Sequence, residues 1–404
     1  MPERLTIVCF SSQPWEDGMW TNKQHVMSRV SKQHRVVFVN FGNQSPFKFV
    51  ARARQRNPRT PVRLHNAWSK PAVRRINDSL EVIDVWAPTW LNFLPRKHWL
   101  RERLDFEHRV NTVGRFLAAE GIRDAVLWVY HPGYGDAVAR LPHRLVVYDC
   151  VDEYTAFPEF RHAKAWIAER ERKLCALAGV VSCTAPALAE SKELLAPGRT
   201  HLVHNVGDGE HFAQAMAEGT VVPDDIKSLP RPTIGFIGAV SDYKLNTEWL
   251  VHLARAKPAW SLVLVGPAGV ADPGTDVAAL QALPNVHLLG HRAYDALPSY
   301  LKGFDVAVIP YRINDYTRAV FPIKFFEFLA SGRPVVISPL PAVQAYWGAV
   351  RVAESPEAFV AQCEAALTEA DPTAQQQRLE LAKQNSWDSR VNKLLGLVEA
   401  ALAS

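Results

Sequence analysis

The chain of 404 residues is roughly two to three times as long as a typical single domain, so we expect two domains. With 48% hydrophobic and 22% charged residues and a net charge of +5, its composition is that of a globular protein and excludes extensive disorder or a fibrous repeat. It contains no uncharged apolar run of about 18 residues and no signal-peptide pattern at its N-terminus, so we expect a cytoplasmic protein without a transmembrane helix.

The first half of the chain alternates short apolar runs with amphipathic stretches. Continuous apolar runs joined by helices are typical of a parallel sheet covered on both faces. We therefore expect residues 1–207 to form a doubly wound, Rossmann-like domain. The expected strands are 5–10, 35–40, 79–85, 125–130, 145–149, 180–184 and 201–205, and the expected helices include 22–31, 96–120 and 163–177.

A basic stretch interrupts this pattern. It has no acidic residue between Phe47 and Ile76, and residues 1–110 hold 19 Lys and Arg against 9 Asp and Glu. Such a block is either a solvated loop or a contact surface for an anionic partner. We favour an anionic membrane surface over nucleic acid, because no recognition motif or aromatic platform accompanies the charge. The cations are Lys48, Arg52, Arg54, Arg56, Arg59, Arg63, Lys70, Arg74 and Arg75.

The alternation stops and then restarts. Residues 208–232 contain three prolines and are predicted to be an interdomain linker. A second Rossmann-like domain is expected over 233–385, and a helix in segment 386–404 is expected to return to the first domain. Ligands of such sheets bind at the carboxyl ends of the strands, so we expect the site in a cleft between the domains. The expected strands are 233–238, 261–266, 286–290, 305–311 and 334–338, and the expected helices are 247–256, 294–304, 324–331, 356–370 and 388–402.

The run AVFPIKFFEFLASGRPVVIS predicts a helix between two strands of the second domain. Pro322 suits the first turn of a helix and Gly332 its carboxyl end. Lys324 is unfavourable beside the positive end of a helix, unless a diphosphate bound there neutralises it. Glu327, one turn further on, can accept hydrogen bonds from both hydroxyls of a ribose. The alternative is an ordinary Lys–Glu pair on the surface.

The pattern FPIKFFEFLASGRPVV resembles the nucleotide-sugar signature of GT-B glycosyltransferases, in particular the retaining family 4 and its relatives in bacterial surface-polysaccharide synthesis. The resemblance runs through most of the chain in the same order. It implies an α/β protein of GT-B architecture, with two Rossmann-like domains facing a central cleft. It also implies transfer of a sugar from a nucleotide-diphosphate sugar without a metal or another cofactor. The other resembling segments are 146–158, 180–192, 231–246, 261–267 and 283–311.

The resemblance assigns a donor site. Gly238 marks the turn where the backbone approaches the diphosphate, and Lys244 and Lys324 bind its phosphates. The motif's glutamate binds the ribose, and the residues after strand 286–290 wrap the base. The family places a second acid eight residues before that glutamate, where this chain has Ala319, so the donor sugar and the stereochemistry stay open. The expected donor site comprises Gly238, Lys244, His291, Arg292, Tyr311, Pro322, Ile323, Lys324 and Glu327.

Three acids lie at the end of one predicted strand of the first domain and supply catalytic candidates. An inverting transfer needs a carboxylate to take the proton of the acceptor hydroxyl, whereas in a retaining transfer the leaving diphosphate can take it. We expect Asp152 to be the base or to position the acceptor, with Glu153 beside it, and Asp149 to be structural. Alternatively, all three acids cap the helix that follows. His131 lies at the end of another strand. It contacts the donor sugar or the acceptor, or alternatively it has a structural role only.

The segment after the first strand, residues 11–25, combines a tight Asp-Gly turn with two tryptophans. Aromatic faces suit sugar rings, and the resemblance places acceptor recognition here. The alternative is a packed surface loop with buried tryptophans. The expected acceptor-binding residues are Trp15, Asp17, Gly18 and Lys23.

These patterns together predict a glycosyltransferase that acts on a lipid-linked or growing bacterial surface glycan, such as a polyprenyl-diphosphate-linked acceptor, at the cytoplasmic face of the inner membrane. The alternative is an inactive GT-B scaffold or a sugar-binding subunit of a polysaccharide assembly machine. An epimerase or phosphorylase on the same scaffold is a further possibility. The sequence disfavours a dinucleotide-dependent dehydrogenase, because no G-x-G-x-x-G follows the first strand. The five cysteines are widely spaced, so neither disulfides nor a metal site is expected.

Overall fold

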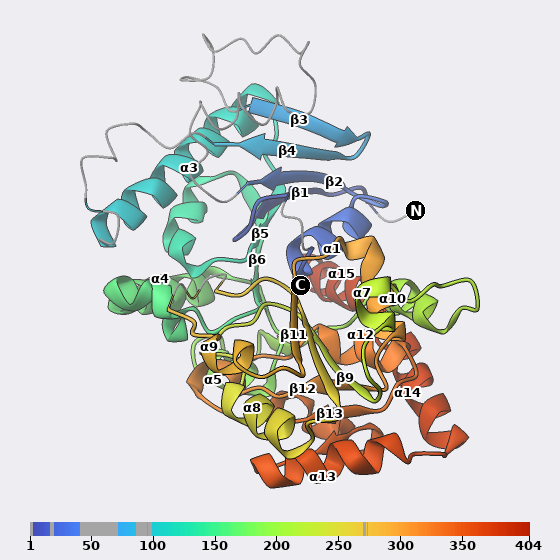
Figure 1. Ribbon diagram of the computed structural model, residues 1–404. Coiled ribbons are helices and arrows are strands. Elements are labelled where there is room, and N and C mark those ends of the chain that lie inside the picture. The colour runs from blue at the N-terminus through green and yellow to red at the C-terminus, as the bar shows by residue number, and fades with distance from the viewer. Residues whose placement is uncertain are drawn as a thin grey trace, which may run out of the picture. The chain divides into compact units, whose positions relative to one another are not determined.

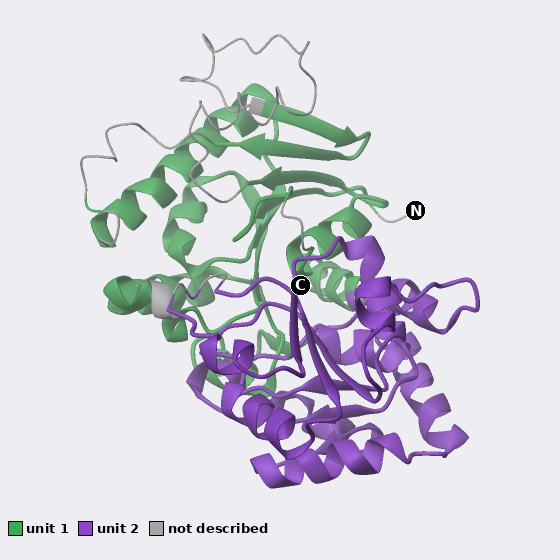
Figure 2. Ribbon diagram, in the orientation of Figure 1, with its two compact units in different colours: residues 1–203, 391–404 green, residues 204–390 purple. Residues whose placement is uncertain are grey.

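The computed structural model describes residues 3–16, 20–40, 72–85, 95, 99–269, 272 and 274–404. The chain divides into two compact units: unit 1 comprises residues 1–203 with 391–404, and unit 2 comprises residues 204–390 (Figure 2). Each unit has its own sheet of mainly parallel strands, which confirms the predicted α/β class with two Rossmann-like sheets (Figure 1).

The sheet of unit 1 has the strand order β3-β4-β2-β1-β5-β6-β7-β8. Its neighbouring strands pair in parallel, except that β3 runs antiparallel to β4. The central strands are apolar and buried on both faces, as the continuous apolar runs predict. The strands are β1 (Thr6–Phe10), β2 (Arg35–Val39), β3 (Ala72–Asn77), β4 (Leu80–Asp84), β5 (Ala125–Val129), β6 (His143–Cys150), β7 (Val180–Cys183) and β8 (Thr200–Leu202).

Helices lie on both sides of this sheet, with α3 on one side and α1 on the other (Figure 1). Short 3-10 segments follow β5 and β6 at their carboxyl ends, where a parallel sheet binds its ligands. The helical elements are α1 (Asn22–Val30), α3 (Trp99–Ala119), η3 (Pro132–Arg140), η4 (Tyr154–Ala156), η5 (Pro158–Ala163), α4 (Lys164–Leu177), α5 (Pro186–Glu193) and α15 (Trp387–Ala403), of which residues 391–403 belong to unit 1.

Strand β3 is a correction, because the sequence predicts no strand at 72–77. It forms by pairing with β4. Arg74, one of the nine cations of the basic stretch, lies on β3 and donates through Nε to Oδ2 of Asp84 at 2.7 Å; it also pairs with Glu16. This cation is therefore neutralised within unit 1. Residues 47–71 of the basic stretch lie outside the described residues.

The sheet of unit 2 has the order β11-β10-β9-β12-β13-β14, and its strands pair in parallel. The strands are β9 (Thr233–Ile237), β10 (Ser261–Val265), β11 (Val286–Gly290), β12 (Val306–Ile309), β13 (Val335–Ile337) and β14 (Arg351–Val352). The helical elements are α6 (Gly209–Ala213), η6 (Gln214–Met216), α7 (Asp224–Lys227), α8 (Thr247–Ala256), α9 (Ala278–Gln281), η7 (Tyr294–Ala296), α10 (Leu297–Lys302), α11 (Asp315–Arg318), α12 (Lys324–Ala330), η8 (Pro341–Ala349), α13 (Pro356–Leu367) and α14 (Pro372–Gln384).

Residues 208–232, predicted to be a linker, instead belong to unit 2 and carry α6, η6 and α7. Phe212 and Ile226 from this segment are buried. A Cβ on Gly303, at the end of α10, would lie 2.9 Å from Cγ2 of Ile226, so α7 packs closely there. The segment therefore contributes to the core of unit 2, although its elements are too short to show a helical period.

Candidate active site

In unit 2, the chain segments that follow β9 and β10 touch each other. Gly238 and Gly266 have φ values of +147° and +145°, a region that glycine adopts readily and other residues do not. A Cβ on Gly266 would lie 2.0 Å from the carbonyl oxygen of Gly238, and a Cβ on Gly238 would lie 2.9 Å from Nζ of Lys324. Both positions need glycine, and they leave bare backbone beside an ammonium group.

Lys324 is the first residue of α12. Its Nζ donates to the hydroxyl of Tyr311 at 2.7 Å and lies 5.2 Å from the ring centroid of Phe236. Burial raises the pKa of Tyr311, but the charges of Lys324 and Lys244 outweigh it and lower that pKa below its ordinary value. Within the described part of the chain, no carboxylate forms an ion pair with Lys324, so its charge is available to an anionic ligand.

The turn before α12 brings Lys324 into place. The N–H of Phe325 donates to the carbonyl of Pro322 at 3.0 Å, and Ile323 between them already has helical backbone angles. Because this turn depends on neighbouring residues only, it matches the helix start that the sequence predicts.

Glu327 is half-buried in the first turn of α12. Burial raises its pKa to about 8; the Lys324 charge opposes this shift, and Asp208 adds to it. A Cβ on Gly207 would lie 2.7 Å from the backbone nitrogen of Glu327, so only glycine lets this segment approach α12 so closely.

Sequence reasoning missed Gly207 and Asp208, which fell at the edge of the predicted linker. The signal was present in the run NVGDGEH, where two glycines flank an acid directly after a strand. Asp208 caps α6 and accepts a hydrogen bond from the hydroxyl of Tyr294 at 3.2 Å. This acid therefore has a structural role and also adds negative charge near Glu327.

Lys244 lies between two aromatic rings of unit 2. Its Nζ is 5.3 Å from the ring centroids of both Tyr243 and Tyr316, a distance at which cation–π attraction operates. Ala319, at the position where the resembling family has an acid, follows α11 and is 5% exposed. A small buried methyl group therefore replaces that carboxylate.

The two residues predicted to wrap the base, His291 and Arg292, differ in their surroundings. His291 is exposed directly after β11. Arg292 is held by the protein, since Nη2 donates to Asp225 at 2.9 Å and Nε to the hydroxyl of Tyr300 at 2.7 Å. The structure therefore gives the Arg292 side chain a role in fastening this segment to α7 and α10.

His131 is buried at the carboxyl end of β5 in unit 1. Its Nδ1 accepts a hydrogen bond from the N–H of Gly133 at 2.9 Å. Burial, with the nearby charges of Lys23 and Arg109, lowers the pKa of His131 to about 3. The ring is therefore neutral at physiological pH, with its proton on Nε2. The rings around it belong to Phe106, Tyr154 and Phe160, with centroids 4.8, 4.5 and 5.5 Å from its own.

The three acids at the carboxyl end of β6, of which Asp149 lies in the strand itself, differ in their environments. Asp149 is fully buried and accepts a hydrogen bond from the hydroxyl of Ser182 at 2.8 Å. Asp152 is half-buried, and its charge adds to burial in raising the pKa of Tyr154. Glu153 caps η4 by accepting from the N–H of Thr155 at 3.2 Å, as the capping alternative proposes for it.

Glu153 is also tied to a buried lysine. Lys192, from α5, donates to Oε2 of Glu153 at 3.3 Å and to Oε2 of Glu171 at 2.9 Å. Burial raises the pKa of Glu153, but the Lys192 charge together with the hydrogen bonds from Thr155 and Lys192 outweighs burial and lowers the pKa below its ordinary value. Both oxygens of Glu153 accept hydrogen bonds within unit 1, which gives this residue a structural role. Asp152 remains the acid predicted to act as the base or to position the acceptor.

We expect Lys192→Met to lower the free energy of unfolding by about 3–5 kcal/mol, because it leaves the buried Glu171 carboxylate without its ion pair. Lys173→Met is the matched control: Lys173 is 39% exposed and pairs with Asp136 at 3.3 Å, so we expect a loss below about 1 kcal/mol. Urea unfolding of both variants measures the difference. Equal losses would contradict a stabilising role for the buried network.

The predicted acceptor segment is only partly described. Trp15 is buried and packs against Phe38 and Trp20, with centroids 5.0 and 5.4 Å apart, as in the packed-loop alternative. Lys23 is buried in α1, with Nζ 5.7 Å from the ring centroid of Tyr130. Asp17 and Gly18 lie outside the described residues.

Comparison with known proteins gives the class of this chain. Residues 231–369 match the family model described as glycosyl transferases group 1. The chain is 28% identical over 285 residues to TuaH of Bacillus subtilis (strain 168), named as a teichuronic acid biosynthesis glycosyltransferase, and the match covers 67% of this chain and 70% of that protein.

Solved structures share the fold. Trehalose 6-phosphate synthase from Burkholderia multivorans superposes with a TM-score of 0.69 at 14% identity, covering 99% of this chain and 100% of that chain. Sucrose-phosphate synthase from Thermosynechococcus elongatus gives 0.69 at 16% identity, covering 99% and 100%. Anabaena Alr3699/HepE in complex with UDP gives 0.65 at 14% identity, covering 98% and 100%.

The fold is that of GT-B glycosyltransferases. Residues 231–369 form a group 1 glycosyltransferase domain, and the chain is a nucleotide-sugar-dependent glycosyltransferase. This confirms the family resemblance and the enzyme class that the sequence predicts.

Proposed function

We propose that this enzyme transfers a sugar from a nucleotide-diphosphate sugar to a hydroxyl of a lipid-linked or growing bacterial surface glycan. The observation that carries the donor half is Lys324, an ammonium group without a carboxylate partner in the described residues, beside the bare backbone of Gly238. The likeness to a glycosyltransferase named for teichuronic acid biosynthesis supports the glycan acceptor.

The proposed donor site is in unit 2. Lys324 and Lys244 neutralise the diphosphate, which comes close to the backbone at Gly238, and Glu327 accepts hydrogen bonds from the ribose hydroxyls. The exposed His291 contacts the base. Because ammonium groups supply the positive charge, we propose that transfer needs no divalent metal and continues in the presence of EDTA.

The proposed acceptor and catalytic residues are in unit 1. Asp152 takes the proton of the acceptor hydroxyl or positions the acceptor, and the neutral His131 donates a hydrogen bond from Nε2 to a substrate oxygen. Lys23 contributes to acceptor recognition, and Asp17 and Gly18 keep the role that the resemblance implies. Trp15, which packs against Phe38 and Trp20, supports this segment from inside unit 1.

A panel of nucleoside diphosphates and nucleotide sugars tests this function. A ligand that binds the native state raises the unfolding temperature by mass action, so the matching donor should give the largest shift. The selected nucleotide sugar is then incubated with enzyme and membrane lipid extract, with and without EDTA. Release of the nucleoside diphosphate supports the proposal, and a panel without any shift contradicts it.

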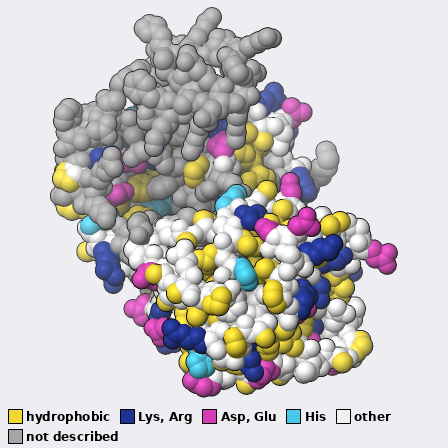
Figure 3. Space-filling model, in the orientation of Figure 1, with side chains coloured by type: hydrophobic (Ala, Val, Ile, Leu, Met, Phe, Trp, Pro, Cys, Tyr) yellow, Lys and Arg dark blue, Asp and Glu magenta, His cyan; other side chains and the backbone are white. Residues whose placement is uncertain are grey.

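We propose that the basic stretch holds the enzyme against anionic lipid at the cytoplasmic face of the inner membrane. No described helix is long and apolar enough to cross a membrane. On the face shown in Figure 3, charges of both signs are interspersed over the described surface, whereas the basic stretch holds nine cations and no acid, and of these nine Arg74 is paired within unit 1. Each cation near an anionic surface contributes about 1 kcal/mol.

We expect the enzyme to sediment with phosphatidylglycerol-containing vesicles at 0.1 M salt and to be released at 1 M, where the screening length falls from about 10 Å to about 3 Å. Changing Arg52, Arg54, Arg56 and Arg59 to Gln should reduce the bound fraction several-fold. Equal binding to phosphatidylcholine vesicles, or retention in high salt, would contradict electrostatic attachment.

A further inference from the structure

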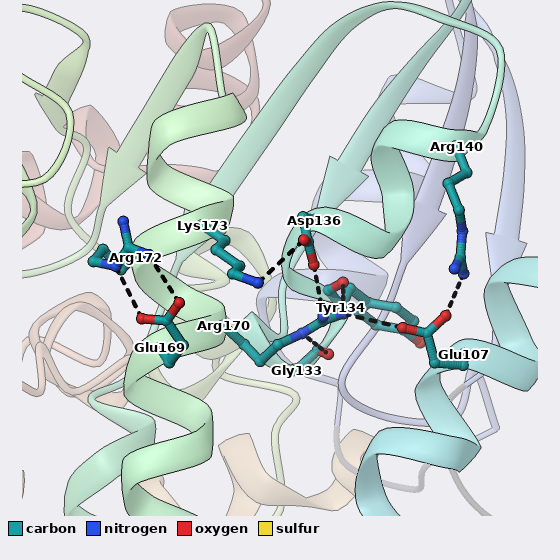
Figure 4. Close-up of polar contacts among 9 residues, drawn as sticks. All are labelled: Glu107, Gly133, Tyr134, Asp136, Arg140, Glu169, Arg170, Arg172 and Lys173. Atoms are coloured by element: carbon teal, nitrogen blue, oxygen red, sulfur yellow. Dashed lines mark hydrogen bonds and ion pairs between the residues drawn. The ribbon is translucent and has the colours of Figure 1, made fainter.

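The segment after His131 is fastened by one arginine of α4 (Figure 4). Arg170 is 7% exposed and binds this segment through its three guanidinium nitrogens. Its Nε donates to the carbonyl of Gly133 at 3.2 Å and its Nη2 to the carbonyl of Tyr134 at 2.5 Å. Its Nη1 donates to Oδ1 of Asp136 at 2.6 Å. Because the guanidinium is planar and rigid, these bonds fix two successive peptide groups together.

Two glycines make these contacts possible. Gly135 has φ +47°, and a Cβ there would lie 2.4 Å from Nε of Arg170. A Cβ on Gly133 would lie 2.4 Å from the ring of Phe106 and 2.9 Å from Nδ1 of His131. The two glycines of the run HPGYGD therefore leave room for the arginine on one side and for the histidine on the other.

The guanidinium is itself held in place. Glu107, from α3, lies 3.7 Å from Nη2 of Arg170, and Asp136 also pairs with Lys173 of α4 at 3.3 Å. Figure 4 shows these charges on different sides of the arginine. Two helices and the segment after His131 thus meet at Arg170, so this side chain has little freedom to move.

We propose that Arg170 is a positioning residue that sets the direction and the tautomer of His131. It fixes the carbonyl of Gly133, and the N–H of the same glycine donates to Nδ1 of His131. With Nδ1 accepting, the ring proton stays on Nε2, where it is a donor for a substrate oxygen. The inference rests on the proposed function in one respect, which is the contact between His131 and substrate.

Arg170→Lys tests the inference, because lysine keeps the charge beside Asp136 but cannot hold two carbonyls in a fixed plane. We expect kcat with the nucleotide sugar selected by the panel to fall about 100-fold, as for a small misplacement of a reacting group, with KM for that sugar nucleotide unchanged. Nitrogen NMR of the histidine rings should show a single Nε2–H tautomer for His131 in the parent and a mixture in the variant. Arg172→Lys is the control, since Arg172 is 57% exposed and pairs with Glu169 on the same helix.

Parent-like His131 nitrogen signals in Arg170→Lys would overturn the inference, whatever happens to the rate. A mixture of tautomers with a parent-like rate would overturn it too, provided that His131→Asn loses activity. If His131→Asn also keeps the parent rate, the proposed role of His131 has failed instead. The NMR readout needs no substrate, so it decides the tautomer question even if no nucleotide sugar is turned over.

Discussion

Replacing Lys324 with alanine should weaken binding of the selected nucleoside diphosphate by about 10- to 150-fold. A hydrogen bond to a charged group contributes about 1.5–3 kcal/mol, and each 1.4 kcal/mol is a factor of ten in affinity. Lys324 donates to Tyr311 and lies beside the bare backbone of Gly238, where we propose that the diphosphate binds. Isothermal titration calorimetry of the parent and the variant measures the loss.

Lys257→Ala is the matched control for this experiment. Lys257 also belongs to unit 2 and also lies near an aromatic ring, that of Trp260, but it pairs with Glu364 of α13. We expect this variant to bind the nucleotide as the parent does. Parent-like affinity in Lys324→Ala would remove the diphosphate assignment, and equal losses in both variants would point to a general effect on unit 2.

The raised pKa of Glu327 adds a pH dependence to the same measurement. Burial keeps this carboxyl protonated below a pKa of about 8 in the free protein, and an ionised carboxylate accepts from two ribose hydroxyls. Affinity should therefore rise with pH towards 8, by at most about tenfold per pH unit, and level off above it. Glu327→Gln should flatten this profile. A profile that is steep in the variant and flat in the parent would contradict the assignment.

Replacing Asp152 with asparagine should leave nucleotide affinity unchanged and lower kcat by about 10²- to 10⁴-fold, the range expected for loss of a general base. Asp152 is in unit 1 and the proposed nucleotide site is in unit 2, so binding and turnover separate the two effects. Calorimetry with the nucleoside diphosphate and a turnover assay on the same preparation make the measurement. Full activity would favour a retaining reaction in which the leaving diphosphate takes the proton.

Asp149→Asn provides the comparison. Asp149 is fully buried and bonded to Ser182, so exchanging an acceptor oxygen for an amide donor should cost about 1–3 kcal/mol of stability. We expect the folded protein to keep most of its kcat. A larger catalytic loss than in Asp152→Asn would reverse the roles of the two acids.

The strands could be predicted because buried parallel strands are continuous apolar runs that can be seen in the sequence alone. β5, with all five residues buried, is typical of these strands. By contrast, β3 depends on pairing with β4, and the helices α6 and α7 depend on burying Phe212 and Ile226 in unit 2. Their stability comes from distant contacts that produce no local period, so a strand was missed and a linker was predicted where unit 2 has helices.

The same distinction applies to the site. Lys324 and Glu327 are three residues apart on one short helix, and local turn chemistry at Pro322 suffices to place them. Their partners Tyr311 and Gly207 come from other parts of the chain, as do Lys192 beside Glu153 and Arg170 beside Gly133. A residue pattern names the groups that can perform the chemistry, because residue type and local spacing are visible in it. Whether such a group is held in place by a buried charge, as Glu153 is by Lys192, depends on contacts between distant parts of the chain. These contacts form only after the sheet has assembled.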